Sequence, residues 1–455
     1  MRALRLVGAG LVAAVVVAGV VLVTIRTTDE PGRVTINLSR RLRAEVTAAG
    51  IFEHLRALQE IADRNRGTRA AGTPGYDDSA EYVAGRLREA GFDVTFDEFV
   101  FPAYSEETPP LLRTPRGERL RVGRDFITLL YSPSGTASGS VTPVDFESST
   151  SGCDNSDFAG FTGGIALVAR GTCFYRDQAA NAEAAGAAGL LIAQPSERGV
   201  IRGTLTTDAQ ASIPVLAVSD SVAAELSGSR ARMEVNSTTR ERTIANVIGE
   251  TGSGADVLMV GGHLDSVLGG PGLNDNGSGV ATILEVAQAV ADESIGRRIR
   301  FAFWGAEEYG LLGSIHYVRA LSSAEHDEIS AYLNFDMLGS PNGVRFIYDD
   351  ADAIRALFES HFESRALSWA EIELEGRSDH ALFAEVGIPV GGLFSGADAV
   401  KTESEAERFG GRAGSAHDPC YHLACDNLGN VDRTILSQMA EAMAGVVGRL
   451  LSREN

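Results

Sequence analysis

Five histidine, aspartate and glutamate side chains in the second half of the chain follow apolar, strand-like runs. Two imidazoles and three carboxylates are enough ligands for two zinc ions if one carboxylate bridges both ions. A further glutamate directly precedes one of these ligands, where it could transfer protons. The combination predicts metal-assisted hydrolysis. The ligands are His263 in VGGHLDSV, Asp275 in GLNDNGSG, Glu308 in FWGAEEYG, Asp336 in YLNFDMLG and His422 in CYHLACD, and the base is Glu307.

Each of these residues has a simpler explanation when it is taken alone. A histidine after an apolar strand is usually structural, and an Asp-Asn-Gly-Ser-Gly run is usually a surface turn. The coincidence argues for a site, because LMVGGHLD, IRFAFWGAEE and AYLNFDM each read as a strand that ends on an acid or an imidazole. In an open α/β sheet, ligand and catalytic groups gather beyond the carboxyl ends of the strands. We therefore expect these segments to converge.

Two further roles follow from local sequence. Metal ions in two-metal sites lie about 3.5–4 Å apart, which requires a short bridging group. Asp275 is the best candidate because it lies in a Gly-flanked turn, where backbone can approach closely. Asp265 lies two positions after His263, so the two side chains face the same way in a strand. It is a candidate for orienting the imidazole, and a plain turn carboxylate is the alternative.

Composition places the chain among globular enzymes. A length of 455 residues predicts two or more domains. The formal net charge of −21 argues against nucleic-acid binding, since no basic patch is available to neutralise phosphates.

The N-terminus predicts export. Residues 6–25 carry no charge and lie between Arg2 and Arg5 on one side and Arg26 on the other. Such a segment can span a hydrocarbon core of about 30 Å. The leading arginines predict a cytoplasmic N-terminus and an extracytoplasmic body. We expect residues 1–30 to be an uncleaved signal anchor that makes the only membrane contact, with a cleaved signal peptide and secretion as the alternative.

The four cysteines agree with export. They fall into two local pairs, Cys153 with Cys173 and Cys420 with Cys425. An even count in an exported chain predicts disulfides. The alternative, one zinc ion held by all four thiolates, requires C-x-x-C-like knuckles that this chain lacks. The second pair brackets His422 and would therefore fasten the loop that presents this ligand.

The composition of successive segments divides the body into a discontinuous α/β domain and an inserted module. Residues 31–123 and 239–455 are expected to form one domain, with strand–helix alternation in the second part, and short β runs rich in Gly and Ser predict a β-rich module over 124–238. This module contains none of the six site residues. The finer expectations are a polar stem over 31–40, two amphipathic helices between Leu42 and Ala90 that end at Gly91, a strand over 92–101, an irregular segment over 104–123 and a last helix over 433–450.

The motifs HLDS, NDNGSG, WGAEE, NFDM, GRSDH and CYH occur in this order. Through them the chain resembles zinc aminopeptidases of the M28 peptidase family, and secreted bacterial members that prefer large apolar N-terminal residues in particular. The likeness runs from about Asn246 to the C-terminus, and residues 45–100 resemble the family's N-terminal portion. A segment around GTC with the following Ala-rich helix resembles a protease-associated (PA) domain. The resemblance implies an α/β fold, a zinc-peptidase (phosphorylase/hydrolase-like) three-layer α/β/α sandwich with an inserted β-rich PA domain.

The resemblance also implies how the site residues divide their work. Two Zn²⁺ ions are expected per chain, with Asp275 between them and a cis peptide after it. His263 and Asp336 would complete one zinc site, and Glu308 and His422 the other. Calcium is known in the family, but the sequence contains no EF-hand-like loop from which a site could be assigned.

Further residues are assigned to catalysis and to the peptide substrate by the same resemblance. Tyr421 would donate a hydrogen bond to the oxyanion. Glu373 would hold the free α-ammonium of the substrate, and Arg377 would orient nearby carboxylates or the substrate carbonyl. Phe394 would form an apolar specificity wall, for which a buried core strand is an equal competitor. We expect a monomer.

Three other functions remain open at this level. PA and peptidase-like domains also occur in non-enzymatic receptors that have lost metal ligands, whereas all five ligands and the base are present here. A glutaminyl cyclase typically uses one zinc ion. A carboxypeptidase requires a cation for the terminal carboxylate, for which Arg377 is the obvious candidate.

Overall fold

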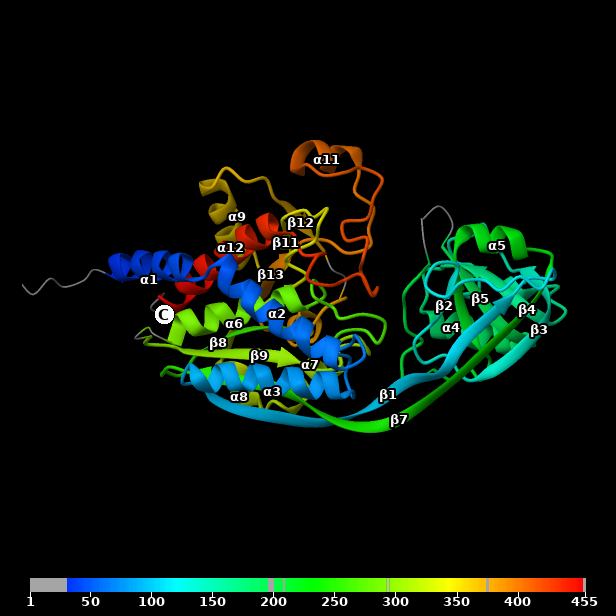
Figure 1. Cartoon of the computed structure of the whole chain (residues 1–455), viewed down its shortest axis with the longest axis horizontal. Helices are drawn as coiled ribbons and strands as arrows, with labels where there is room; N and C mark the ends of the chain where they lie inside the picture. Colours follow the sequence, from blue (N-terminus) through cyan, green and yellow to red (C-terminus); the bar gives the residue numbers. More distant parts are fainter. Residues whose placement is uncertain are drawn as a thin grey trace, which may run out of the picture.

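A computed structural model describes residues 31–194, 200–207, 209–291, 293, 295–373 and 376–452, with side chains from residue 38 onwards. The expected membrane segment at 1–30 lies outside these residues. Among the described helices, none is both long and apolar enough to cross a bilayer. Figure 1 shows two bodies of unequal size, joined by the long strands β1 (Asp93–Arg113) and β7 (Arg230–Thr251).

The larger body is built on a mixed sheet with a parallel centre. Its strand order is β12-β11-β13-β10-β8-β9-β7, and β1 pairs with β7 at the edge. The central strands β13, β10, β8 and β9 are parallel, so their carboxyl ends meet at one edge of the sheet. The bounds are β8 Val257–His263, β9 Arg298–Trp304, β10 Ile329–Asp336, β11 Phe346–Tyr348, β12 Ala370–Ile372 and β13 Val390–Phe394.

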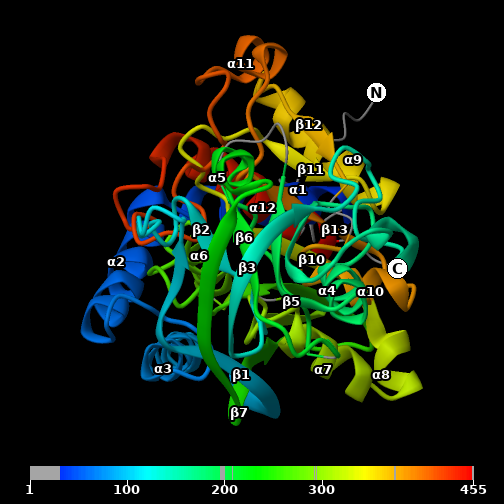
Figure 2. The same cartoon turned by 90° about the vertical axis from the view of Figure 1, so that its right-hand side faces the viewer.

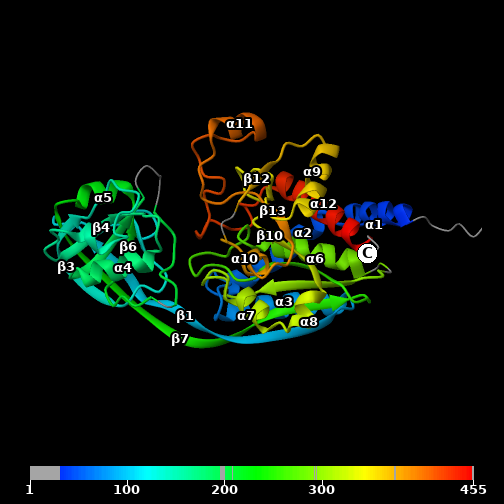
Figure 3. The same cartoon turned by 180° about the vertical axis from the view of Figure 1, so that it is seen from behind.

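Helices cover both faces of this sheet, which makes the expected three-layer α/β/α sandwich. Strand β9 shows the alternation: Phe301 and Phe303 face one apolar core, while Ala302 and Trp304 face the other. Figure 2 looks along the layers. Figure 3, in which the molecule is turned by 180°, shows the face that carries α7, α8 and α10. One face carries α1 (Pro31–Glu45), α2 (Ala48–Arg64), α3 (Pro74–Glu89), α6 (Gly277–Ala291), α9 (Asp352–Ser364) and α12 (Arg433–Leu451), and the other carries α7 (Leu312–Ala320), α8 (Ser323–Glu328) and α10 (His380–Glu385).

The N-terminal helices confirm one prediction and correct another. Helices α2 and α3 lie where two amphipathic helices were expected, and Gly91 ends α3 with a φ of 85°. The expected polar stem over 31–40 is wrong, because this segment belongs to α1. This helix packs along α12, where Ser39 Oγ donates to the Gly445 carbonyl (2.8 Å). A Cβ at Gly448 would lie 2.6 Å from Ser39 Cα, so glycine makes the close helix crossing possible.

The irregular segment expected over 104–123 is corrected in its first half only, because residues 114–123 belong to no helix or strand of the structure. Strand β1 continues to Arg113 and pairs with β7 over its whole length, from Asp93↔Glu250 to Arg113↔Arg232. Its ladder shifts register between Glu106 and Leu111, the stretch that contains a Pro-Pro pair. Prolines lack the N–H that a ladder needs and are tolerated at such bulges. The prolines therefore give this stretch the sequence of a loop, although its pairing with β7 makes it a strand.

The smaller body is the β-rich insertion. Its sheet continues from β7 in the order β3-β4-β5-β6-β2 and encloses an apolar core of its own. The Cys153–Cys173 disulfide lies here. The Ala-rich helix expected from the sequence is present as α4. The elements are β2 Phe126–Thr128, β3 Gly135–Pro143, η1 Asn155–Phe158, β4 Gly164–Ala169, α4 Tyr175–Ala184, β5 Ala187–Ala193, β6 Val215–Val218 and α5 Asp220–Leu226, and the short helix α11 Glu403–Phe409 belongs to the larger body.

Candidate metal centre

The five expected ligands converge at the carboxyl-terminal edge of the parallel strands, although they come from five separate segments. Strand β8 ends on His263 and β10 ends on Asp336. Asp275 lies in the turn before α6, Glu308 in the turn after β9, and His422 in the loop before α12.

Asp275 lies between the other four side chains. One of its oxygens, Oδ1, is 3.2 Å from His263 Nε2, and the other, Oδ2, is 3.1 Å from His422 Nε2. His263 Nε2 is also 3.4 Å from Asp336 Oδ1, and His422 Nε2 is 3.0 Å from Glu308 Oε2. The five residues thus form two groups of three that share Asp275. This arrangement is the one that a carboxylate bridging two ions requires.

Three carboxylate oxygens test whether metal ions fit this site. Asp275 Oδ2, Glu308 Oε1 and Asp336 Oδ1 are buried and accept no hydrogen bond from the described residues. Leaving buried carboxylate oxygens unpaired is costly, so such atoms usually coordinate a cation or accept hydrogen bonds. Two ligand atoms about 2.0–2.1 Å from a tetrahedral zinc ion lie roughly 3.4 Å apart, close to the separations above. The site therefore fits two ions with oxygen and imidazole ligands.

Asparagine 276 fixes the turn that carries Asp275. The Asp275–Asn276 peptide bond is cis. The side-chain Nδ2 of Asn276 donates to the Phe335 carbonyl (2.8 Å). The side-chain Oδ1 of Asn276 accepts from the backbone amides of Met337 and Gly279. A Cβ at Gly279 would lie 2.3 Å from this oxygen, so only glycine fits there. These bonds tie the Asp275 turn to the end of β10.

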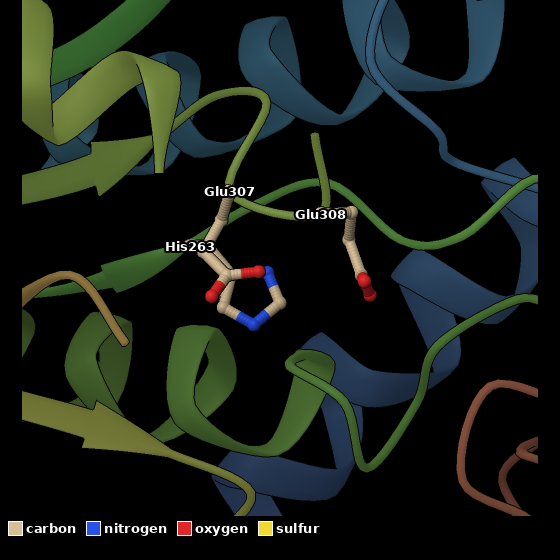
Figure 4. A group of neighbouring side chains, drawn as sticks. All are labelled: His263, Glu307 and Glu308. Carbon is tan, nitrogen blue, oxygen red and sulfur yellow. The ribbon is translucent and has the colours of Figure 1, made fainter. Parts of the chain in front are cut away.

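Asp265 supports the turn after β9. It is fully buried, and its two carboxylate oxygens accept from the backbone amides of Glu307 (3.1 Å) and Glu308 (3.3 Å). His263 Nδ1 lies 3.1 Å from the Asp265 carbonyl oxygen and 3.8 Å from its carboxylate. Figure 4 shows the Glu307 carboxylate over the His263 ring, with Glu308 beside it. The backbone carbonyl of Asp265 therefore makes the close contact with the His263 imidazole. The Asp265 carboxylate instead holds the backbone amides of Glu307 and Glu308.

Comparison with known proteins identifies the family. The model of peptidase family M28 matches residues 246–447, and that of the PA domain matches residues 137–226. An aminopeptidase of Pseudomonas aeruginosa is 41% identical over 432 residues, which cover 89% of this chain and 81% of that protein. The chain belongs to peptidase family M28. It is accordingly a metallo-exopeptidase with an inserted PA domain.

Two further relatives agree with this assignment. A probable lipoprotein aminopeptidase of Mycobacterium tuberculosis is 37% identical over 474 residues, covering 98% of this chain and 94% of that protein. The solved structure of a zinc aminopeptidase from Bacillus subtilis is 25% identical, has a TM-score of 0.69 and covers 88% of this chain and 94% of that one.

The M28 peptidase has a cavity of about 320 Å³ beside the five ligands. Glu373, Arg377 and Phe394 all line it, as does Phe346. The rings of Phe346 and Phe394 stack with centroids 6.2 Å apart. Glu371 is not among the lining residues, and its carboxylate lies 3.9 Å from Arg355. Of the glutamates described in this stretch, Glu373 is thus the one that faces the cavity.

The loop before α12 presents both Tyr421 and His422 to the same cavity. The two rings stack with centroids 3.8 Å apart. The expected Cys420–Cys425 disulfide is present and closes this loop. His422 has a φ of 57°, a left-handed conformation that is costly for a residue with a side chain and that the surroundings must enforce.

Clustered carboxylates dominate the electrostatics of the site. Burial alone would lower the pKa of His422, but Glu308 and Asp275 raise it to about 10. Burial raises the pKa of Glu307 well above its usual range; His263 opposes this effect and the Glu308 charge adds to it. The cluster therefore attracts positive charge, and a bound dication would favour the ionised forms of these carboxylates.

Two important residues were missed by sequence reasoning. Asp426 accepts from the backbone amides of Asn274 (2.9 Å) and Asp275 (3.0 Å) and so holds the bridging turn. It ends the quoted CYHLACD motif, which was the available signal. Arg69 is fully buried and donates to three backbone carbonyls in the loop between β8 and Asp275. Nothing in its local sequence marks it.

Proposed function

We propose that this chain is an exported di-zinc aminopeptidase that removes large apolar residues from the N-termini of peptides. The observation that carries the proposal is the convergence of two imidazoles and three carboxylates on shared positions, with three buried carboxylate oxygens left without a hydrogen bond. The zinc aminopeptidase of Bacillus subtilis supports the choice of metal.

The ligands divide into two sets. His263, Asp275 and Asp336 would hold one zinc ion, and Asp275, Glu308 and His422 the other. Bound zinc ions supply Lewis acidity, which lowers the pKa of water and polarises the substrate carbonyl.

Glu307 would act as the general base. Its carboxylate lies within 4.8 Å of ligand atoms of both His263 and Glu308, so it faces the space where the carbonyl carbon is attacked. It accepts the proton of the attacking water and delivers this proton to the leaving amine. Tyr421 lines the same cavity, and its hydroxyl would donate a hydrogen bond to the oxyanion.

The cavity favours an N-terminal residue with an apolar side chain. Glu373 supplies a carboxylate for the free α-ammonium, and Arg377 lies near Tyr421, where it can orient the peptide carbonyl. The cavity also has an apolar wall, and burial of a leucine side chain there would contribute about 1.5–3 kcal/mol to binding. This wall contains Met337, Phe346, Ile372, Phe394 and Val400.

Export is supported by two observations. Both cysteine pairs form disulfides, which persist in oxidising compartments outside the cytoplasm. The Mycobacterium tuberculosis relative is described as a probable lipoprotein. We propose that residues 1–30 direct this export.

A comparison of two substrates tests the proposal. The zinc-loaded protein should hydrolyse leucine p-nitroanilide and leave N-acetyl-leucine p-nitroanilide intact, because the acetyl group removes the ammonium that Glu373 binds. The variant Glu373→Gln should lose most of this activity, whereas Glu371→Gln, two positions away and directed to solvent, should retain it. Equal rates on the free and the acetylated substrate would contradict aminopeptidase action.

A further inference from the structure

The PA insertion touches the metal centre through one arginine. The two strands β1 and β7 hold the insertion beside the catalytic body (Figures 1 and 3). Arg202 lies in the segment between β5 and β6, and its side chain contacts the catalytic body. Its Nη1 donates to the carbonyl oxygen of His422 at 3.3 Å. The insertion therefore bonds directly to the backbone of an expected metal ligand.

The carbonyl that Arg202 binds belongs to a residue whose backbone conformation must be stabilised by its neighbours. His422 is held in the left-handed conformation, which residues with a Cβ adopt only where neighbours enforce it. Turn bonds close the loop on either side, from Leu423 N to the Cys420 carbonyl (2.9 Å) and from Asp426 N to the Leu423 carbonyl (2.9 Å). The Arg202 bond acts on the peptide of His422 itself.

The segment carrying Arg202 is anchored to the catalytic body. Leu130 N donates to the Gly203 carbonyl (3.0 Å), and Leu205 N donates to the Leu130 carbonyl (2.9 Å). The next residue, Tyr131, donates its hydroxyl to the Pro102 carbonyl of β1 (2.9 Å). Its ring also packs edge-on against Tyr309, the residue after Glu308. These contacts hold the Arg202 segment beside the Glu308–His422 half of the metal centre.

Charge also suits a guanidinium at this place. Burial lowers the pKa of Arg202, while Tyr421, Asp398 and Glu308 raise it, so acidic groups surround the guanidinium. An arginine in a protein keeps its charge. The insertion thus supplies a permanent cation at the edge of a cluster of carboxylates.

We propose that Arg202 is a positioning residue through which the PA domain holds the Tyr421–His422 loop in the geometry that the second zinc site requires. The proposal rests on the proposed function. It predicts that loss of the Arg202 bond weakens the Glu308–His422 site selectively and leaves the His263–Asp336 site and the apolar cavity intact.

The test is zinc binding and turnover of Arg202→Lys, which keeps the charge but loses the planar fork. Apoprotein is titrated with zinc in competition with a chromophoric chelator. One of the two zinc equivalents should bind about 10-fold more weakly, because groups that orient metal ligands typically contribute 10–100-fold to affinity or activity. On leucine p-nitroanilide, kcat should fall about 10-fold while KM stays within about twofold of the unsubstituted protein.

Arg232→Lys is the matched control. Arg232 is an exposed arginine of the insertion, paired with Glu234 at 3.5 Å. If Arg202→Lys binds both zinc equivalents as tightly as Arg232→Lys and turns over at the same rate, the inference is overturned. General destabilisation would instead weaken both equivalents and raise KM, which also overturns it. If the unsubstituted protein binds no zinc and is inactive, the proposed function fails and takes this inference with it.

A double-variant experiment gives a second readout. The Cys420–Cys425 disulfide and Arg202 constrain the same loop, so removing both should have a non-additive effect on zinc affinity. The disulfide is removed by replacing both cysteines with serine, alone and combined with Arg202→Lys. Strictly additive effects on zinc affinity would contradict a shared action on His422.

Discussion

At the residue scale, Glu307 and Glu308 show how neighbouring identical side chains acquire different roles. Both backbone amides are held by Asp265, which fixes the turn after β9. Glu308 Oε2 lies 3.0 Å from His422 Nε2, among the expected ligands. Glu307 lies over the His263 ring instead (Figure 4). One turn therefore presents the proposed ligand Glu308 and the proposed base Glu307 to the same space.

Replacing Glu307 by glutamine should separate catalysis from metal binding. Glutamine keeps the size of the side chain but cannot accept the proton, so kcat on leucine p-nitroanilide should fall by about 10²–10⁴-fold. Zinc content, measured by elemental analysis, should stay unchanged because Glu307 is not among the proposed ligands. A loss of bound zinc in this variant would show that Glu307 is a ligand and not the base.

The sequence predicts the ligand-type residues better than the residues that position them. His263 and Asp336 could be found because each ends an apolar strand, and strand ends are where α/β proteins place their sites. Asp426, Arg69 and Arg202 act mainly on backbone amides and carbonyls of distant segments. Such contacts depend on how loops meet in space, and no local pattern encodes them.

At the element scale, the chain's only lysine holds the segment between β13 and α11. Lys401 is almost fully buried, and its Nζ donates to the carbonyls of Gly343 and Gly410, both at 3.0 Å. Its neighbours Val400 and Thr402 line the cavity. Lys401 therefore links the wall of the cavity to the segment before β11.

Lys401→Met should loosen this wall without touching the metal site. The carbonyls of half-buried Gly343 and exposed Gly410 would lose their donor, and because water can replace part of each bond, the cost is roughly 0.5–1.5 kcal/mol each. KM for leucine p-nitroanilide should rise several-fold while kcat and zinc content stay near those of the unsubstituted protein. Steady-state kinetics with urea unfolding check this expectation; a lowered kcat with unchanged KM would contradict it.

Elements were predictable from the sequence where one periodicity dominates. Helices α2, α3 and α12 were found because their apolar positions repeat at helical spacing. The polar composition of residues 31–40 predicts a stem, because it gives no sign of the contact between α1 and α12. The second half of β1 was missed because its prolines mimic a loop, and only the ladder with β7 makes it a strand.

At the scale of the whole molecule, burial of two histidines makes stability depend on pH. Burial lowers the pKa of His54 and of His361 to about 4, and nearby arginines add to the effect. An unfolded chain binds a proton at these side chains near pH 6.5, whereas the folded chain does so only near pH 4. The unfolded state therefore binds more protons in this window. The stabilisation is complete above about pH 6.5 and is lost as pH falls toward 4.

His361→Gln tests this dependence. Glutamine does not titrate, so the loss of unfolding free energy between about pH 6.5 and pH 4 should become smaller by roughly one proton's contribution. Urea unfolding of the variant and the unsubstituted protein across this range measures the difference. Identical slopes for the two proteins would contradict the assignment of a neutral His361 in the folded state.

Both bodies of the molecule contact the loops that carry the proposed metal ligands. Strands β1 and β7 run through both. Tyr131 of the insertion packs against Tyr309, the residue after Glu308, and Arg202 donates to the carbonyl of His422 itself. The PA domain is in this account a support for the site as well as its neighbour.

Zinc titration of the metal-free protein, followed by calorimetry and by leucine p-nitroanilide turnover, tests the central claim most directly. The five converging ligands predict that binding saturates at two zinc ions per chain and that full activity requires the second equivalent. Saturation at one ion, or turnover that does not respond to zinc, would contradict a di-zinc aminopeptidase.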